Sequence, residues 1–105
     1  MLHLSIAIGP YDRMVPLVLG EARIDAVDAQ FMLLEPEEIF FRAMRHEAFD
    51  ICELSLSSYT LRVARGDCPY VAVPVFPSRA FRHTCVVVRN DRGIRTPADL
   101  RGKRI

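Results

Sequence analysis

Five apolar, β-rich runs alternate along the chain with segments of helical periodicity, and this alternation is the strongest constraint on the fold. Strands separated by helices of about ten residues build βαβ units, and unbroken apolar strands are buried on both faces. The pattern therefore predicts the α/β class, with a mainly parallel sheet flanked by helices. The five runs are LHLSIAI (2–8), AVDAQFMLL (26–34), DICELSL (50–56), YVAVPVF (70–76) and TCVVV (84–88).

The segments between these runs carry helix signals. Pro16 suits the opening turn of the first segment, and Gly20 and Gly66 stand where helices commonly end. Serine caps are expected to open the third segment. The three helical segments are 11–20, 35–48 and 57–67, of which the second is expected to open at Pro36 and close with Arg42, Arg45 and His46, and the third to end at Gly66. The second has an apolar stripe that is expected to be buried, formed by Ile39, Phe40, Ala43 and Met44.

The chain has 105 residues, half of them hydrophobic, which is enough for one compact domain or a piece of one. It finishes with TPADLRGKRI (96–105), which predicts one short helical turn followed by the beginning of a strand at Lys103–Ile105. A domain is not expected to stop there. We expect either a truncated chain or an exposed edge that something else covers, for example a second copy in a homo-oligomer.

The formal net charge of +1 hides a gradient along the chain. Residues 1–78 contain eleven acidic and six basic side chains, whereas residues 79–105 contain two acidic and eight basic side chains. A basic segment can bind nucleic acid, but this one is interrupted by acids and apolar residues and lacks a known nucleic-acid-binding motif. No nucleic-acid partner is expected.

Signals for export or membrane insertion are weak in this chain. No apolar run approaches the roughly 20 residues of a membrane span, so no membrane partner is expected. Residues 2–8 follow Met1 without the basic region of a signal peptide. Cys52, Cys68 and Cys85 are odd in number and widely spaced, which fits neither a disulfide framework nor paired zinc ligands. Together these features predict a cytoplasmic protein with reduced thiols.

Candidate site residues follow the strands, because ligands of open α/β sheets bind outside the carboxyl ends of the strands. Tyr11, Asp12 and Arg13 follow the first run, Ser55, Ser57 and Ser58 surround the end of the third, and Arg79, Arg82 and His83 follow the fourth. Glu53 lies within the third run, where a buried carboxylate must be paired or functional. These ten residues form the predicted site.

The residue types at this site are typical of anion recognition with proton transfer. Arginine binds carboxylates through two parallel hydrogen bonds, and a serine-rich helix start offers free N–H groups. Histidine titrates near neutral pH and can act as an acid or base. Each residue type also has a structural alternative. Ser57 or Ser58 can merely cap its own helix, and Arg79 and Arg82 can lie in an exposed turn or pair with acids such as Asp12 or Glu53. Glu53 can face solvent, and His83 can be structural.

The whole chain resembles the N-terminal third of the 4,5-dihydroxyphthalate decarboxylase family. The matching stretches are YDR (11–13), LEPEEIFFRAMRHEAFDICELSLSSY (34–59), VAVPVFPSRAFRHTCVVV (71–88) and GIRTPADLRGKRI (93–105). The resemblance implies a two-lobed fold like that of type II periplasmic solute-binding proteins. Residues 1–105 would form the N-terminal part of the first lobe, with the second lobe absent.

The implied activity is decarboxylation of an aromatic dicarboxylate such as 4,5-dihydroxyphthalate, a lyase reaction in phthalate degradation and aromatic compound catabolism. From residue chemistry we assign the anion clamp to Arg79 and Arg82 with the Ser57 region, and proton transfer to His83 with Glu53 or Asp12. No cofactor is implied. A divalent metal at His83 and a carboxylate stays open, although no spacing supports one. The alternative function is a solute-binding protein or sensor for a small carboxylate, without catalysis.

Overall fold

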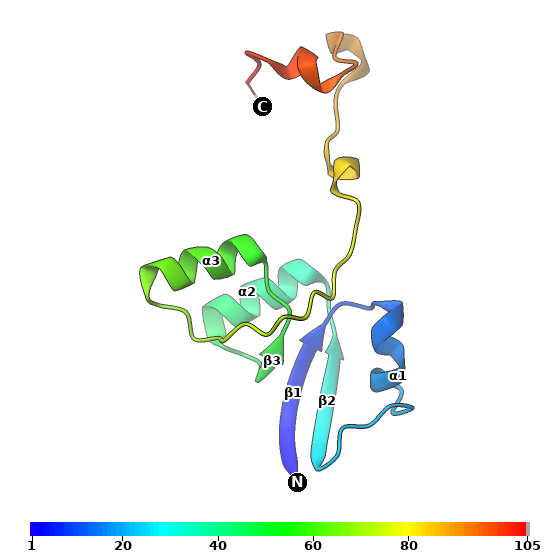
Figure 1. The fold of residues 1–105 in the computed structure, drawn as a ribbon, viewed down its shortest axis with the longest axis vertical. Helices are drawn as coiled ribbons and strands as arrows, with labels where there is room; N and C mark the ends of the chain where they lie inside the picture. The colour runs from blue at the N-terminus through cyan, green and yellow to red at the C-terminus, as the bar shows by residue number, and fades with distance from the viewer. Residues whose placement is uncertain (105) are drawn as a thin grey trace.

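A parallel three-stranded sheet is the centre of the fold (Figure 1). The computed structural model describes residues 1–104, apart from the side chain of His83. The strands are β1 (Leu2–Ile8), β2 (Val27–Leu33) and β3 (Ile51–Cys52), in the order β2-β1-β3. Helices follow each strand, so the predicted α/β class with a parallel sheet is confirmed.

The strand register places the carboxyl ends of the strands together. Leu2 pairs with Val27 and Ile8 with Leu33 along the full length of β1, whereas β3 pairs only through Ile51 and Cys52. The strand predicted over 50–56 is therefore much shorter, because the chain turns into a helix at Leu56. The Glu53 N–H still donates to the Ala7 carbonyl at 3.2 Å, so the backbone of β3 stays in line with β1 one residue further.

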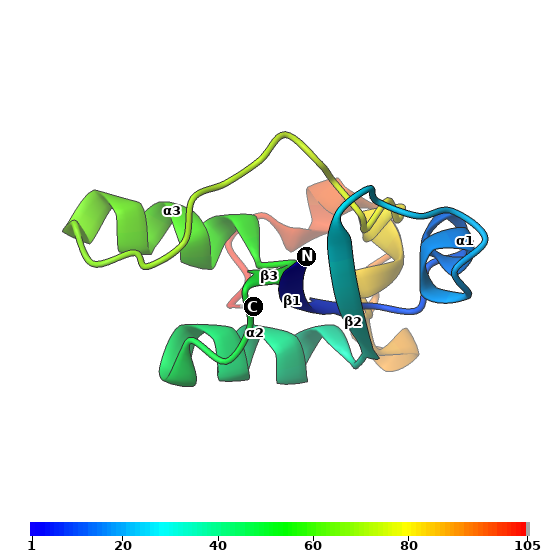
Figure 2. The same ribbon diagram turned by 90° about the horizontal axis from the view of Figure 1, so that it is seen from below.

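All three predicted helices are present: α1 (Val15–Val18), α2 (Pro36–His46) and α3 (Leu56–Arg65). A short 3-10 turn, η1 (Asp12–Met14), precedes α1, and Gly20 and Gly66 adopt the left-handed conformation expected at helix ends. The serine cap of α3 is Ser55, whose hydroxyl accepts the Ser58 N–H at 3.4 Å, rather than a serine at the predicted start of 57. Figure 2 shows α2 and α3 on opposite sides of the sheet.

The hydrophobic core lies between β1 and α2. Ile39 and Ala43 are completely buried there, together with Ala7 and Phe49, while Phe40 and Met44 are partly buried. The predicted apolar stripe of the second helix is thus confirmed. On the other side of the sheet, α3 has no buried residue, and its Leu61 and Val63 are exposed. Ile6 and Ile8, which alternate with Ala7 along β1, are nevertheless buried as well.

The strand predicted over 70–76 does not form. This segment is extended but has no ladder partner among the described residues, and Val71, Val73 and Val75 are exposed. Its main tertiary hydrogen bonds use tyrosines, because the Ala72 N–H donates to the Tyr59 hydroxyl at 3.2 Å and the Tyr70 hydroxyl donates to the Phe49 carbonyl at 3.2 Å. An apolar run alone does not make a strand, since strand formation needs a neighbouring backbone.

The strand predicted over 84–88 is also wrong. The chain forms the 3-10 turn η2 (Arg82–Cys85) at its start, and the Thr84 hydroxyl donates to the Phe81 carbonyl at 2.9 Å. Residues 86–88 continue without secondary structure and lead to η3 (Asn90–Arg92) and η4 (Pro97–Leu100). The predicted short turn after Thr96 is confirmed as η4, with a capping box formed by Thr96 and Asp99. The expected strand start at 103–105 ends on Ile105, which lies outside the described residues.

Residues 77–104 leave the body of the molecule as an extended arm (Figure 1). The radius of gyration is 18.3 Å, compared with about 13 Å for a compact domain of this length. The arm makes the molecule 59 Å long and only 21 Å thick. Only the beginning of the arm lies against the sheet, and this beginning contributes to the candidate site.

Candidate functional site

The candidate site lies at the carboxyl ends of β1 and β3. The order in which the strands are added to the sheet reverses between these two neighbouring strands. The chain leaves β1 to form β2 on one side and returns on the other side as β3. The loops after β1 and β3 therefore lead to different parts of the molecule, α1 next to β2 and α3 on the far side (Figure 1). Such a switch point is where open α/β sheets bind ligands.

Glu53 connects these two loops. Its side chain is buried, with 9% exposure, and both of its oxygens accept hydrogen bonds. Oε1 accepts the backbone N–H of Gly9 at 3.1 Å, and Oε2 accepts the Tyr11 hydroxyl at 2.9 Å. The prediction that a carboxylate in this apolar strand is either paired or functional is borne out by its pairing, and the alternative that it faces solvent is wrong.

Tyr11 contacts Glu53, Ser78 and Arg13. Partial burial raises the pKa of its phenol, and the hydrogen bond to Glu53 raises this pKa further, while a hydrogen bond with Ser78 opposes the shift. The guanidinium of Arg13 lies over the Tyr11 ring, 5.3 Å from the ring centroid. A phenol in this environment stays protonated and remains a hydrogen-bond donor across the physiological pH range.

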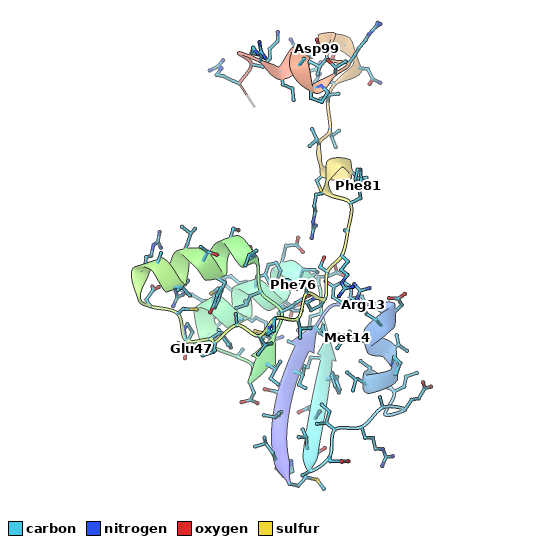
Figure 3. The ribbon with its side chains drawn as sticks, viewed as in Figure 1. Arg13, Met14, Glu47, Phe76, Phe81 and Asp99 are labelled. Atoms are coloured by element: carbon cyan, nitrogen blue, oxygen red, sulfur yellow. The ribbon has the colours of Figure 1, made fainter. Side chains whose placement is uncertain are left out.

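Arg13 joins the loop after β1 to the beginning of the arm. Its Nη2 donates to the carbonyl of Pro77, and Figure 3 shows Arg13 beside the segment that carries Phe76. Nη1 contacts the Asp12 carboxylate at 3.3 Å. The Asp12 side chain is 94% exposed, so this ion pair is a weak one at the surface. The structure thus brings Arg13 into one cluster of contacts with Gly9, Tyr11 and Glu53. Asp12 lies on the solvent side of this cluster.

Arg79 and Arg82 lie in the arm and are both exposed. Arg79 Nε donates to the Phe76 carbonyl at 3.3 Å, and Arg82 Nη2 donates to the Ser78 hydroxyl at 3.1 Å. Within the described residues, neither arginine forms an ion pair with Asp12 or Glu53. Arg82 is linked to the cluster through Ser78, whereas the hydrogen bond from Arg79 Nε stays within its own turn.

The three serines stand at the beginning of α3, which leaves the end of β3. Ser55 is the cap residue, and its hydroxyl also contacts the Ser57 hydroxyl at 2.9 Å. The Ser58 N–H is used by the cap. The structural alternative that Ser57 or Ser58 caps the helix is therefore wrong, because the cap is Ser55, and Ser57 is exposed.

The predictions for His83 and for a metal site depend on which residues the structure describes. His83 falls within η2, but its side chain lies outside the described residues. Among the residues that the structure does describe, no group of three or more His, Cys, Asp or Glu side chains is placed to hold a metal ion. The same part of the chain contains no helix with the length and apolarity needed to cross a bilayer.

Gly9, Pro77 and Ser78 follow the first and fourth runs and so met the same positional rule, but they were not among the ten residues assigned to the site. Gly9 contributes a backbone N–H and Pro77 a backbone carbonyl, and no side-chain pattern signals such contacts in a sequence. Ser78 could have been found, because it stands directly before Arg79 in the segment already assigned to the site.

A shallow hollow elsewhere is formed along the strands themselves, away from their carboxyl ends, by His3, Leu4, Ser5, Asp28, Gln30 and Asp50.

Comparison with known proteins identifies close relatives. No family model matches the chain. A 4,5-dihydroxyphthalate decarboxylase of Pseudomonas putida is 67% identical over 104 residues, which cover 99% of this chain and 40% of the relative. The enzyme of the same name from Comamonas testosteroni is also 67% identical over 104 residues, covering 99% of this chain and 32% of the relative. The predicted resemblance is confirmed, and the chain spans about a third to two fifths of the relatives it matches.

Proposed function

We propose that this chain contributes part of the active site of a decarboxylase that acts on an aromatic dicarboxylate such as 4,5-dihydroxyphthalate. The observation that carries the proposal is the 67% identity, along 99% of the chain, to two proteins with that name. In this proposal residues 1–105 form the N-terminal part of the first lobe of a two-lobed fold like that of type II periplasmic solute-binding proteins. The ligand then binds at the carboxyl ends of β1 and β3.

The chemistry sets the demands on the site. A hydroxyl para to the departing carboxylate gives up its proton and supplies electrons to the ring, and the carbon that bears the carboxylate accepts a proton. The electron pair of the carbon–carbon bond then restores the aromatic ring as carbon dioxide leaves. The reaction replaces a carboxylate by hydrogen and needs a base, an acid and a cationic group that holds the second carboxylate.

Arg13, Arg79 and Arg82 are the proposed carboxylate-binding residues. Arg13 is the best positioned, because its guanidinium is held over the Tyr11 ring while 41% of its side chain remains exposed to a ligand. Arg82 is oriented by Ser78 on the same side of the cluster. Ser57 and Ser58 at the start of α3 add polar groups to this surface, and the positive end of the helix dipole favours an anion there.

Proton transfer is assigned to His83, with Asp12 or Glu53 as its partner. Asp12 is open to solvent, whereas both oxygens of Glu53 are engaged in hydrogen bonds. This engagement favours a second candidate, in which the site captures a small carboxylate without transforming it. Solute binding needs the cationic groups but no acid or base.

Cellular location and assembly belong to the same proposal. Cys52, Cys68 and Cys85 are free thiols, which suits a reducing compartment, and we place the protein in the cytoplasm. The exposed valines of residues 71–75 support self-association into a homo-oligomer.

A chimera tests the enzymatic proposal directly. The 104 matched residues of this chain replace their counterparts in the Pseudomonas putida relative, and both the carbon dioxide released from 4,5-dihydroxyphthalate and the calorimetric binding of this dicarboxylate are measured. We expect turnover within about tenfold of the unmodified relative, since the two sequences are 67% identical here. A folded chimera that binds the dicarboxylate without releasing carbon dioxide supports the solute-binding alternative, and one that does neither contradicts both.

A further inference from the structure

Gly9 occupies a crowded position at the carboxyl end of β1. The residue is buried, and its N–H is held by Glu53. A Cβ atom placed on Gly9 would lie 2.9 Å from Cζ of Tyr11 and 3.0 Å from both Cε2 and the hydroxyl oxygen. The Tyr11 ring therefore lies directly against the backbone at Gly9, in the space that any other side chain would fill.

The backbone conformation of Gly9 does not itself require glycine. Gly9 is absent from the glycines with positive φ, whereas Gly20, at φ +74, has open space around its missing Cβ. These two glycines thus serve opposite needs. Gly20 supplies a left-handed conformation, while Gly9 supplies room for an aromatic ring.

The space beside Gly9 lets the Tyr11 side chain contact Gly9, Glu53 and Arg13 at the same time. With its ring against Gly9, Tyr11 reaches Glu53 Oε2 at 2.9 Å and lies beneath the Arg13 guanidinium. The Glu53 carboxylate is fixed in turn by the Gly9 N–H, so the three residues close a small loop of contacts around the end of the strand. Moving the ring away from Gly9 breaks the hydrogen bond to Glu53 and removes the surface on which Arg13 rests.

We propose that Gly9 and Glu53 are positioning residues, which together hold the Tyr11 ring beneath Arg13 and thereby aim Arg13 at the carboxylate of the ligand. The ligand part of this inference rests on the proposed function. Because both Glu53 oxygens are used in holding Tyr11 and Gly9, proton transfer falls to His83 and Asp12. Arg13 touches the ligand, and Gly9 and Glu53 act through it.

The first test follows the titration of the Tyr11 phenol in the 105-residue chain by NMR of tyrosine labelled at Cζ, with Tyr11→Phe used for assignment. In the unmodified chain Tyr11 titrates above the usual pKa of 10.0. We expect Gly9→Ala and Glu53→Gln each to bring this pKa back toward 10.0, because the ring becomes more solvated or loses its negatively charged partner. Gly20→Ala, which strains the backbone elsewhere, is expected to leave the Tyr11 titration unchanged.

A double-mutant cycle separates positioning from a general loss of fold. Gly9→Ala should destabilise the chain when Tyr11 is present and have almost no effect when Tyr11 is replaced by Ala, because the clash partner is gone. The inference is overturned if Gly9→Ala leaves the Tyr11 titration unchanged, or if it costs as much stability with Ala at position 11. Should Gly9→Ala fail to fold, the Glu53→Gln titration and the folded double variant decide the question.

A ligand titration then distinguishes this inference from the proposed function. With 4,5-dihydroxyphthalate as the probe, Gly9→Ala should weaken binding by about tenfold, which is the usual effect of removing one charge-assisted hydrogen bond. If the unmodified chain binds no dicarboxylate, the ligand role assigned to it fails, while the Tyr11 titration still decides whether Gly9 and Glu53 position the ring. If dicarboxylate binds equally to both chains, the aiming of Arg13 is wrong.

Discussion

At the scale of single residues, Asp50 fastens the beginning of β3 to the middle of β1. Its Oδ2 accepts the Ser5 hydroxyl at 2.6 Å and the Ser5 N–H at 2.8 Å, and its own N–H donates back to the Ser5 hydroxyl at 3.0 Å. These bonds, the hydroxyl first, lower the pKa of Asp50 below its usual value of 3.8. Three hydrogen bonds thus support a strand that has only two residues in the ladder.

The Ser5–Asp50 contact predicts a pH-dependent stability. A lowered carboxyl pKa stabilises the fold above pH 3.8, and this contribution disappears as the pH falls through the lower pKa of the folded state. Ser5→Ala should therefore lower the free energy of unfolding at pH 7, and its difference from the unmodified chain should shrink as the pH falls below 3.8. Urea unfolding of both chains at several pH values measures this. Ser57→Ala is the control, and a difference for Ser5→Ala that does not change with pH contradicts the prediction.

The residues of the site differ in how far a sequence can reveal them. Glu53 was recognisable because a carboxylate among apolar strand residues needs a partner, and the structure supplies two. The identity of those partners depends on how two loops meet, which no local pattern contains. For the same reason the contact of Arg13 with the Pro77 carbonyl, 64 residues away in the chain, was out of reach.

At the scale of elements, α2 and α3 end in different ways. Gly66 ends α3 in the left-handed conformation at φ 73, whereas α2 ends on Glu47 at φ 50, where an L side chain is strained. Figure 3 shows Glu47 at the end of α2, where the chain turns back toward β3. The sequence indicated the end of α3 through Gly66 and the end of the second helix through the basic residues of its last turn, Arg45 and His46, but no residue pattern indicated the left-handed conformation of Glu47.

These two helix ends predict opposite responses to matched substitutions. Glu47→Gly should stabilise the chain by about 0.5 to 1 kcal/mol, since relief of the left-handed strain exceeds the greater chain entropy of glycine in the unfolded state. Gly66→Ala should destabilise it by about 1 kcal/mol for the converse reason. Thermal or urea unfolding measures both. A destabilised Glu47→Gly variant would show that the Glu47 side chain makes a contribution larger than its backbone strain.

The strands show the same dependence on context. The runs 2–8 and 26–34 became β1 and β2 because each lies beside another strand, and all seven residue pairs between them are formed. The run 70–76 is as apolar and as rich in valine, yet it has no strand beside it among the described residues. Helices form their hydrogen bonds within one segment and could therefore be predicted singly, whereas a strand is a property of a pair.

At the scale of the whole molecule, the chain exposes apolar groups that a folded domain would normally bury. Val71 is 91% exposed and Val87 is 88% exposed. The exposed apolar side chains of the extended region are Val71, Val73, Val75, Phe76, Phe81, Val86, Val87 and Val88. A monomer seldom keeps so many apolar side chains in contact with water, because their burial is favourable.

We therefore expect the purified chain to self-associate through residues 71–75. Sedimentation velocity should show a sedimentation coefficient that rises with protein concentration, and added sulfate should strengthen the effect because it favours apolar burial. Replacing Val73 and Val75 together by Lys should weaken association by about tenfold or more, since each exposed valine contributes roughly 1 to 2 kcal/mol when buried.

The control for this substitution is Ala80→Lys, which adds a positive charge at an exposed position of the neighbouring arm without removing a valine. If charge repulsion alone opposed association, Ala80→Lys would reduce it in proportion to the added charge. If the valines form the contact, Ala80→Lys should leave it almost unchanged. A chain that stays monomeric at every concentration would instead mean that the segment folds back onto its own sheet, and protection of the Val73 and Val75 amides from hydrogen exchange would then reveal a fourth strand.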